Sequence, residues 1–318
     1  MPQSPRLEIA AAFAVLLLAV HGRAAHAADP APGRPDPQAE AESAFQSAGK
    51  AAQRGPVAVA LAGQARLQVP EHFAFVPKAE AERLMKAFGN SLDSGFQGMI
   101  VPHAADNSFS FYDVTYHATG YIKDDDARSW DADKLLEQVR EGTDEANKRR
   151  RQMGLPEVEV TGWVEKPSYD AATHHLVWSI GAHDKGRAAG EGDVINYKTL
   201  VLGREGYLSM TLVTDKSHIA DLRPATATLL NGLTFDDGRR YADFNSSTDH
   251  VAEFGLAALV AGVAAKKLGL LALGAAFVVK FAKIIGVAAV GSAVALRKWL
   301  GLRKKDTAAP APGSGPAA

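Results

Sequence analysis

The chain has 318 residues, no cysteine and a formal net charge of −1. Without cysteine it can have neither a disulfide, nor a thiolate zinc site, nor a cysteine nucleophile. The near-zero charge hides a division, because residues 28–250 carry 24 Lys and Arg against 33 Asp and Glu, whereas residues 251–318 carry 9 against 2. An acidic main segment argues against nucleic-acid binding.

The first 27 residues have the pattern of a secretory signal peptide. Arg6 gives a weakly positive start, residues 9–20 an apolar core, and residues 25–27 a cleavage site of small residues. The core is well short of the ~20 apolar residues that a membrane-spanning helix needs. We therefore expect cleavage after Ala27, with an uncleaved amino-terminal anchor as the alternative.

Residues 28–54 predict a flexible lead-in, because they are rich in Pro, Ala, Gln and Glu and poor in large apolar side chains. Residues 55–244 predict a single α+β domain. Its expected strands lie at 57–61, 65–69, 97–101, 109–116, 158–164, 175–180, 195–202, 207–213 and 233–235, and its expected helices at 77–88, 131–153 and 219–230. Because many strands follow one another directly, we expect a mainly antiparallel sheet with helices packed on it.

Residues 245–302 form the expected membrane-anchoring helical segment; it is apolar from residue 251 onward and is broken by basic residues at 266–267, 280, 283 and 297–298. Each central lysine costs about 2.5–3.5 kcal/mol in a membrane, which nearly cancels the gain from the apolar residues. We expect a membrane anchor, either a span whose lysines reach the interface or a helix lying on the surface. A pair of Ala-rich helices packed on the domain is the alternative. The side chains expected in the membrane are Leu256, Leu259, Leu271, Phe277, Ile284 and Val290.

Residues 303–318 begin with three basic residues and continue as a Pro/Ala/Gly-rich tail that we expect to be disordered. If the anchor crosses once, the positive-inside rule puts residues 303–305 in the cytoplasm and the acidic domain outside.

Several short strings spread over roughly residues 55–300 resemble one family. They are GYIKDDDA at 120–127, GW at 162–163, PxYD at 167–170, LxW at 176–178, NY at 196–197, LGRxG at 202–206 and GxxYADF at 238–244. The set is similar to a bacterial family of uncharacterised membrane-anchored proteins, domain-of-unknown-function family 2167. The resemblance implies export and membrane anchoring, and it brings no established activity and no catalytic residues.

The expected architecture is also similar to the Mog1/PsbP-like αβα sandwich. The shared features are an antiparallel sheet followed by a helix and a short Leu-x-Phe strand, at residues 233–235 here. This likeness implies a fold and says nothing of function.

Two groups of residues could assemble a metal or enzyme site in the fold. The first is Asp124 to Asp126, whose carboxylates could bind a hard cation, although the loop lacks the spacing of an EF-hand. The second consists of His174, His175 and His183, but adjacent histidines on a strand point to opposite faces. The weak metal candidates are therefore Asp124, Asp126, His175 and His183, and we expect a solvated loop and no metal or other cofactor.

Three residues are candidate ligand-binding residues. Arg204 lies in a tight turn, where its guanidinium could clamp a carboxylate or phosphate, or instead brace the turn against Asp193 or Glu205. Tyr121 and Trp178 are the aromatic candidates, with packing in the core as the simpler interpretation. No serine-hydrolase elbow, zinc-protease motif or phosphate loop is present.

We therefore predict a membrane-anchored envelope protein that binds a partner or ligand and is not an enzyme. It would lie in the bacterial inner membrane with its main domain in the periplasm, in contact with membrane lipids and another envelope protein. An enzyme with a site assembled only in the fold is one alternative. A lipid-binding or membrane-remodelling protein acting through the cationic carboxy-terminal helices is the other.

Overall fold

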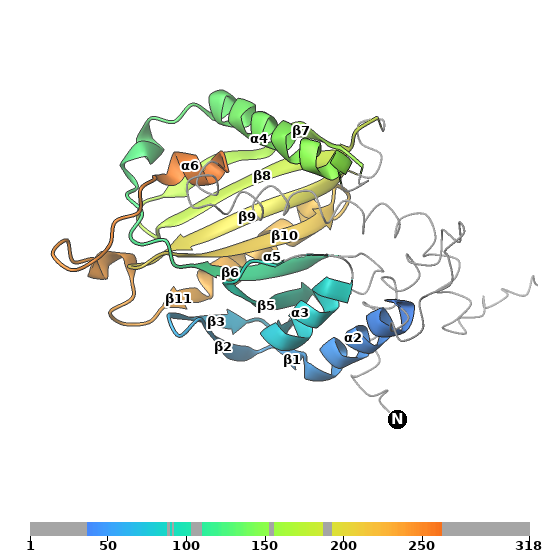
Figure 1. Cartoon of the computed structure of the whole chain (residues 1–318). Helices are drawn as coiled ribbons and strands as arrows, with labels where there is room; N and C mark the ends of the chain where they lie inside the picture. Colours follow the sequence, from blue (N-terminus) through green and yellow to red (C-terminus); the bar gives the residue numbers. More distant parts are fainter. Residues whose placement is uncertain are drawn as a thin grey trace, which may run out of the picture.

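The computed structural model describes residues 37–87, 90, 92–102, 110–152, 156–186 and 193–262 (Figure 1). Its helices are α2 (Pro37–Ala51), α3 (Lys78–Ala87), α4 (Ala132–Gln152), α5 (Ile219–Asn231) and α6 (Leu256–Val260), with 3-10 helices η1 (Asp125–Arg128) and η2 (Tyr241–Asp243). The strands are β1 (Gln53–Arg54), β2 (Val57–Leu61), β3 (Ala65–Val69), β4 (Phe73–Pro77), β5 (Phe96–Pro102), β6 (Phe111–His117), β7 (Val158–Asp170), β8 (His175–Asp184), β9 (Val194–Leu202), β10 (Tyr207–Asp215) and β11 (Leu233–Phe235).

Eight strands form one sheet in the order β1-β4-β5-β6-β10-β9-β8-β7, and every neighbouring pair is antiparallel. A tight turn joins β9 to β10, in which the Gly203 amide donates to the Gly206 carbonyl at 2.8 Å. A second antiparallel sheet has the order β11-β3-β2. The expected α+β class with a mainly antiparallel sheet is confirmed.

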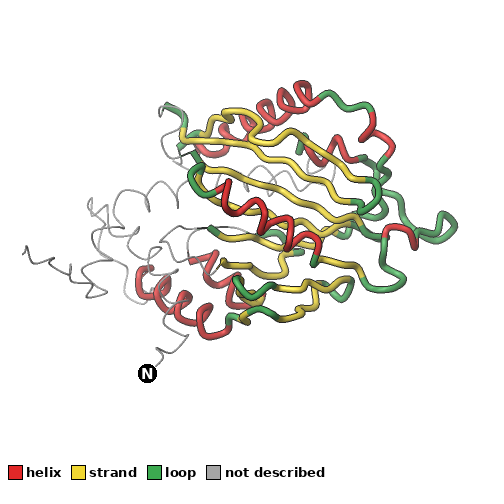
Figure 2. Tube along the Cα trace, turned by 180° about the vertical axis from the view of Figure 1, so that it is seen from behind, coloured by secondary structure: helices red, strands yellow, loops and turns green. Residues whose placement is uncertain are grey.

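Two layers cover the main sheet. On one side, called the helical face, α2 and α3 pack on β4 and β5, while α4 and α6 pack over the β7–β8 end (Figure 1). On the other side, called the hairpin face, lie α5 and the three-stranded sheet (Figure 2). The arrangement is an αβ sandwich, and side chains alternate between the two faces along each strand.

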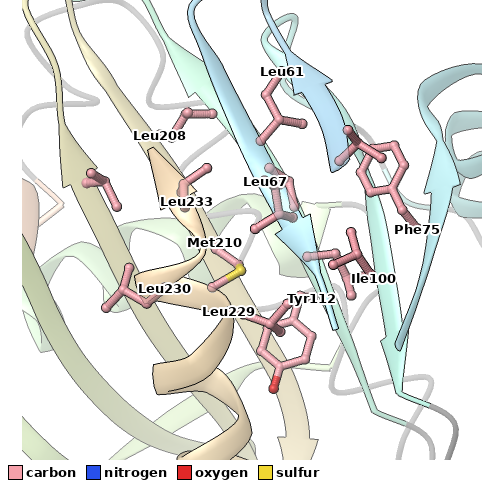
Figure 3. Packing of buried hydrophobic residues seen from close by; sticks show 14 of the residues in the cluster. Leu61, Leu67, Phe75, Ile100, Tyr112, Leu208, Met210, Leu229, Leu230 and Leu233 are labelled. Carbon is pink, nitrogen blue, oxygen red and sulfur yellow. The ribbon is translucent and has the colours of Figure 1, made fainter. Parts of the chain in front are cut away.

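The core of the hairpin face holds the small sheet onto the large one (Figure 3). Alternate residues of β3 are buried, and Leu67 packs in one cluster with Leu229 of α5 and Ile100 of β5. Burying one such side chain contributes about 1.5–3 kcal/mol, so these contacts fix the hairpin in place.

Most expected elements of the domain are present within a few residues of their predicted ends. The hairpin of β2 and β3 is confirmed, and Asp131 caps α4 as expected by accepting hydrogen bonds from the amides of Asp133 and Lys134 at 3.0 and 3.3 Å. Strand β4 was missed. Four of its five residues are buried, because it is covered on both faces, so it lacks the alternation that marks a half-exposed strand.

Residues 37–51 are helix α2, where the sequence predicted part of a flexible lead-in. Ala41, Ala44, Phe45 and Ala48 are buried and recur at the spacing of one helix face. The small side chains concealed this pattern, because alanine adds little apolar area to a sequence profile. The packed structure therefore begins before residue 55.

The packed structure also continues beyond residue 244. Leu256 and Leu259 are buried against the main sheet in α6, so the expectation that they face lipid is wrong for these two residues. Leu271, Phe277, Ile284 and Val290 lie outside the described residues. No helix in the described part of the chain is long and apolar enough to cross a membrane.

Candidate functional site

Two polar clusters lie at the main sheet, and the first contains several of the candidate residues. The first, which we call the clasp, joins Tyr121, Ile122, Asp126 and Arg204 to the last described segment, residues 241–257. The Tyr121 amide donates to the His250 carbonyl at 2.8 Å, and the Ala252 amide donates to the Tyr121 carbonyl at 2.8 Å. The hydroxyl of Tyr241 donates to the Ile122 carbonyl, also at 2.8 Å. These bonds fix the chain that leads into α6.

The ring of Tyr121 lies between two other aromatic rings. Its centroid is 4.4 Å from that of Tyr241 and 3.9 Å from that of Phe244, and both pairs are stacked. Tyr241 is in turn 4.2 Å from the ring of His174. Burial raises the pKa of both Tyr121 and Tyr241. The faces of Tyr121 are thus occupied within the protein, which favours the packing interpretation of this candidate.

Arg204 makes a two-pronged ion pair with Asp249. Its Nε and Nη2 donate to the two carboxylate oxygens at 2.7 and 2.8 Å. Asp249 also accepts from the Asn245 amide and the Thr248 hydroxyl, each at 2.8 Å. The hydrogen bond from Arg204 holds the pKa of Asp249 well below its usual range. Arg204 braces the turn as one interpretation expected, but against Asp249 rather than Asp193 or Glu205.

Asp126 is a hydrogen-bond acceptor within the clasp, and Asp124 is one beside it. Asp124 accepts from the Tyr169 hydroxyl at 2.8 Å. Asp126 accepts from the amides of Leu256 and Ala257 at 3.1 and 2.9 Å, and so caps the amino end of α6. Any side chain at Gly255 would collide with the Asp126 carboxylate, which explains the glycine.

The three histidines do not come together. His174 lies against the Tyr169 hydroxyl, with its Nδ1 3.0 Å away. His175 follows on β8 and points to the hairpin face, and burial lowers its pKa. His183 is buried further along β8, with Nδ1 3.2 Å from an oxygen of Asp193. Among the described residues, no group of three or more His, Asp or Glu is arranged to hold a metal ion.

Trp178 leads to the second cluster. It is buried on the helical face beneath α6, and its ring lies 5.8 Å from the Lys198 ammonium. A ring that is 3% exposed offers no surface for a ligand to stack on, so the ligand-binding expectation for Trp178 itself is not supported by its position.

A row of polar side chains begins beside this tryptophan. In the register of the sheet Trp178 pairs with Lys198, Lys198 with Thr211, and Thr211 with Asp113. Asn196 precedes Lys198 by two residues on β9 and therefore points to the same face. We call Asp113, Asn196, Lys198 and Thr211 the polar strip. It crosses β6, β10 and β9, between the helices at the two ends of the sheet (Figure 1).

Three atoms of the strip are buried without a hydrogen-bond partner. They are Oδ1 of Asp113 and both polar atoms of the Asn196 carboxamide, in residues that are each 2% exposed. In the described part of the chain, the other residues with such atoms are Arg54, Asn90, Glu165 and Ser179. Of these, Glu165 still has an ion pair with Arg223 at 2.7 Å. In the strip, β6 and β9 thus bring buried, unpartnered polar atoms to the same side of the sheet.

Burial governs the charges of the strip. It raises the pKa of Asp113 to about 7, and the nearby Lys198 ammonium and Thr211 hydroxyl limit that rise. Burial also lowers the pKa of Lys198, against the effect of Asp113. Further along the same face, Nε2 of His117 lies 3.2 Å from Oγ of Ser209. Burial lowers the pKa of His117 to about 4.

Sequence reasoning did not find the strip. Asp113 lies in β6 and Asn196 and Lys198 lie in β9, two strands whose residues are mostly buried; an ionisable or amide side chain is unusual in such a position and was the available signal. Their convergence depends on β10 pairing with both β6 and β9, which no local pattern reveals.

Comparisons with known proteins identify the family of the chain. No curated protein matches the chain. Among solved structures, a cyanobacterial PsbP from Synechocystis is similar at a TM-score of 0.32 and 7% identity, over 54% of this chain and 86% of that one. A protein of unknown function from Pseudomonas aeruginosa is similar at a TM-score of 0.25 and 12% identity, over 54% of this chain and 91% of that one. The family model for the proteins of unknown function DUF2167 matches residues 53–291, so the chain belongs to this family.

Proposed function

We propose that this protein is a non-enzymatic binding module of the bacterial cell envelope and that the polar strip is its binding site. The supporting observation is the set of three buried, unpartnered atoms on Asp113 and Asn196. Buried polar atoms in folded proteins are nearly always hydrogen-bonded, and each one left unpaired costs about 1–3 kcal/mol. A ligand that pairs with these atoms would recover that free energy on binding.

The position of the strip supports the same proposal. It lies at the centre of the main sheet, on strands whose ends are fixed by many backbone hydrogen bonds. A rigid floor preorganises its side chains, so little conformational entropy is lost when a ligand binds. The clasp has a different character, because its carboxylates and its guanidinium already have partners.

The proposed location of the module rests on sequence patterns near the two ends of the chain. The leader pattern of residues 1–27 supports export, and the basic residues at 303–305 support an inner-membrane anchor with the domain in the periplasm. We expect contact with membrane lipids and with another envelope protein. Protease added to spheroplasts should digest the domain while leaving a cytoplasmic marker intact. Survival of the domain until the membrane is lysed would contradict this address.

Native mass spectrometry of the full-length protein, purified in mild detergent from its own membranes, tests the binding proposal. We expect a reproducible adduct of small mass on the wild-type protein that is lost in Asn196→Ala. Asn147→Ala is the matched control, because Asn147 is also a buried asparagine but has both polar atoms paired with Val158. An adduct retained in Asn196→Ala and lost in Asn147→Ala would place the binding site elsewhere.

A further inference from the structure

The unpartnered atoms of the strip define a hydrogen-bonding pattern. The Asn196 carboxamide presents a donor and an acceptor side by side, and Asp113 presents an acceptor. The group that complements a carboxamide is another amide, which offers a carbonyl and an N–H in the same arrangement. A second N–H would then satisfy the open oxygen of Asp113.

The spacing of the two residues sets the length of such a ligand. Asn196 and Phe111 both pair with Val213, and Asp113 lies two residues further along β6. Two strand spacings and two residues along a strand give about 12 Å between the Cα atoms of Asn196 and Asp113. One amide cannot reach both side chains. An extended peptide advances about 3.3 Å per residue, so two to four residues span the distance.

The charges of the strip favour a ligand without net charge. Asp113 and Lys198 carry opposite charges when both are ionised, and both act on the same row of the sheet. A small anion attracted by the ammonium would be repelled by the carboxylate. A cation attracted by the carboxylate would be repelled by the ammonium. Neutral amides gain hydrogen bonds from the strip without that opposition.

Apolar side chains flank the strip on both sides. Phe111 and Val213 belong to the cluster under α2 and α3, whereas Ile180 and Leu200 belong to the cluster under α4 and α6. Such walls suit the apolar side chains of a peptide. They suit a sugar less well, because sugar sites rely on an exposed aromatic ring and Trp178 is covered.

We propose that the polar strip binds a short, neutral, free peptide of about two to four residues, with amides that pair with Asn196 and Asp113. This inference rests on the proposed binding function. A free peptide of this size can be enclosed by the protein, as the burial of the unpartnered atoms requires, whereas the surface of a folded partner cannot.

Calorimetric titration of the full-length protein in detergent tests this inference. The probe is a library of N-acetylated tripeptide amides with apolar side chains, and the paired probe carries an ester in place of the central amide. We expect binding that weakens at least tenfold in Asn196→Ala and about fivefold with the ester probe, since each change removes hydrogen bonds of the kind proposed.

Two controls make the outcome specific. Ser179→Ala removes a buried, unpartnered hydroxyl from the opposite face of β8 and should leave peptide binding unchanged. Equal binding of ester and amide probes, or no binding of either, overturns the peptide inference. If the mass-spectrometric adduct is nevertheless lost in Asn196→Ala, the binding function stands and the ligand belongs to another chemical class. If the adduct is also absent from wild-type protein, both proposals fail.

Discussion

The clasp and the polar strip use similar residues in opposite ways. In the clasp, Asp249 accepts hydrogen bonds from Arg204, Asn245 and Thr248, so its charge is fully compensated. In the strip, Asp113 is more deeply buried, at 2% exposed, but keeps one oxygen unpaired. Paired polar groups stabilise the fold, whereas unpaired ones lower its stability and can be retained only for another reason. The pairing of a buried polar residue therefore separates a structural role from a binding role better than its type does.

The largest expected effect tests the clasp. Tyr241→Ala removes a buried ring that stacks on Tyr121 and a hydrogen bond to the Ile122 carbonyl. We expect the free energy of unfolding to fall by about 3–5 kcal/mol, as for other buried aromatic residues replaced by alanine. Urea denaturation measures the change. Tyr241→Phe keeps the ring and should lose only about 1 kcal/mol. Equal losses in the two variants would show that the stack contributes nothing.

The pH dependence of stability tests the strip. Burial raises the pKa of Asp113 to about 7, above its value in the unfolded chain. Between about pH 4 and pH 7 the folded state therefore holds a proton that the unfolded state has released, so stability falls as the pH rises. The loss is complete about one pH unit above this pKa and is on the order of 4 kcal/mol.

Asp113→Asn serves to isolate this contribution. Other carboxylates act in the opposite direction, for example Asp249, whose pKa is lowered. The quantity to measure is therefore the stability of wild type minus that of Asp113→Asn at each pH. A difference that stays flat from pH 4 to pH 7 would mean that Asp113 is ionised throughout this range and is not perturbed by burial.

How far the sequence could predict these two regions depends on the range of the interactions. The β2–β3 hairpin and the Asp131 cap were predictable, because an alternating pattern and a capping residue act over a few positions. The pairing of Arg204 with Asp249 and the convergence of Asp113 with Asn196 were not. These contacts join residues far apart in the chain through the strand order, which the local pattern does not encode.

Two buried asparagines give a direct comparison of paired and unpaired groups. Asn147 and Asn196 are both 2% exposed, but Asn147 donates to the Val158 carbonyl at 2.8 Å and accepts from the Val158 amide at 2.9 Å. Asn147→Ala leaves both backbone groups unpaired and should lower stability by about 2 kcal/mol. Asn196→Ala removes the same side-chain volume as Asn147→Ala, but the two polar atoms that it removes are unpaired. We therefore expect stability to be unchanged or to rise by up to about 1 kcal/mol.

Thermal unfolding of the two variants without ligand measures this difference. The prediction concerns its sign, with Asn196→Ala melting at a higher temperature than Asn147→Ala. The same Asn196→Ala protein should bind ligand more weakly, which is the trade-off between stability and function expected at a binding site. Equal destabilisation of both variants would mean that Asn196 is paired in solution, and the strip would lose its distinction from the clasp.

The smallest expected effect concerns the end of the clasp that leads to the anchor. Asp126→Ala removes the cap of α6 and should lower stability by about 1 kcal/mol, the usual contribution of an amino-terminal cap. Gly255→Ala should have a similar effect without removing the carboxylate, because its methyl group displaces Asp126. Hydrogen exchange should quicken at the amides of residues 256 and 257 in both variants while β9 and β10 stay protected. If exchange in β9 and β10 quickens equally, the clasp and the strip open together, and the separation of a structural region from a binding region does not hold.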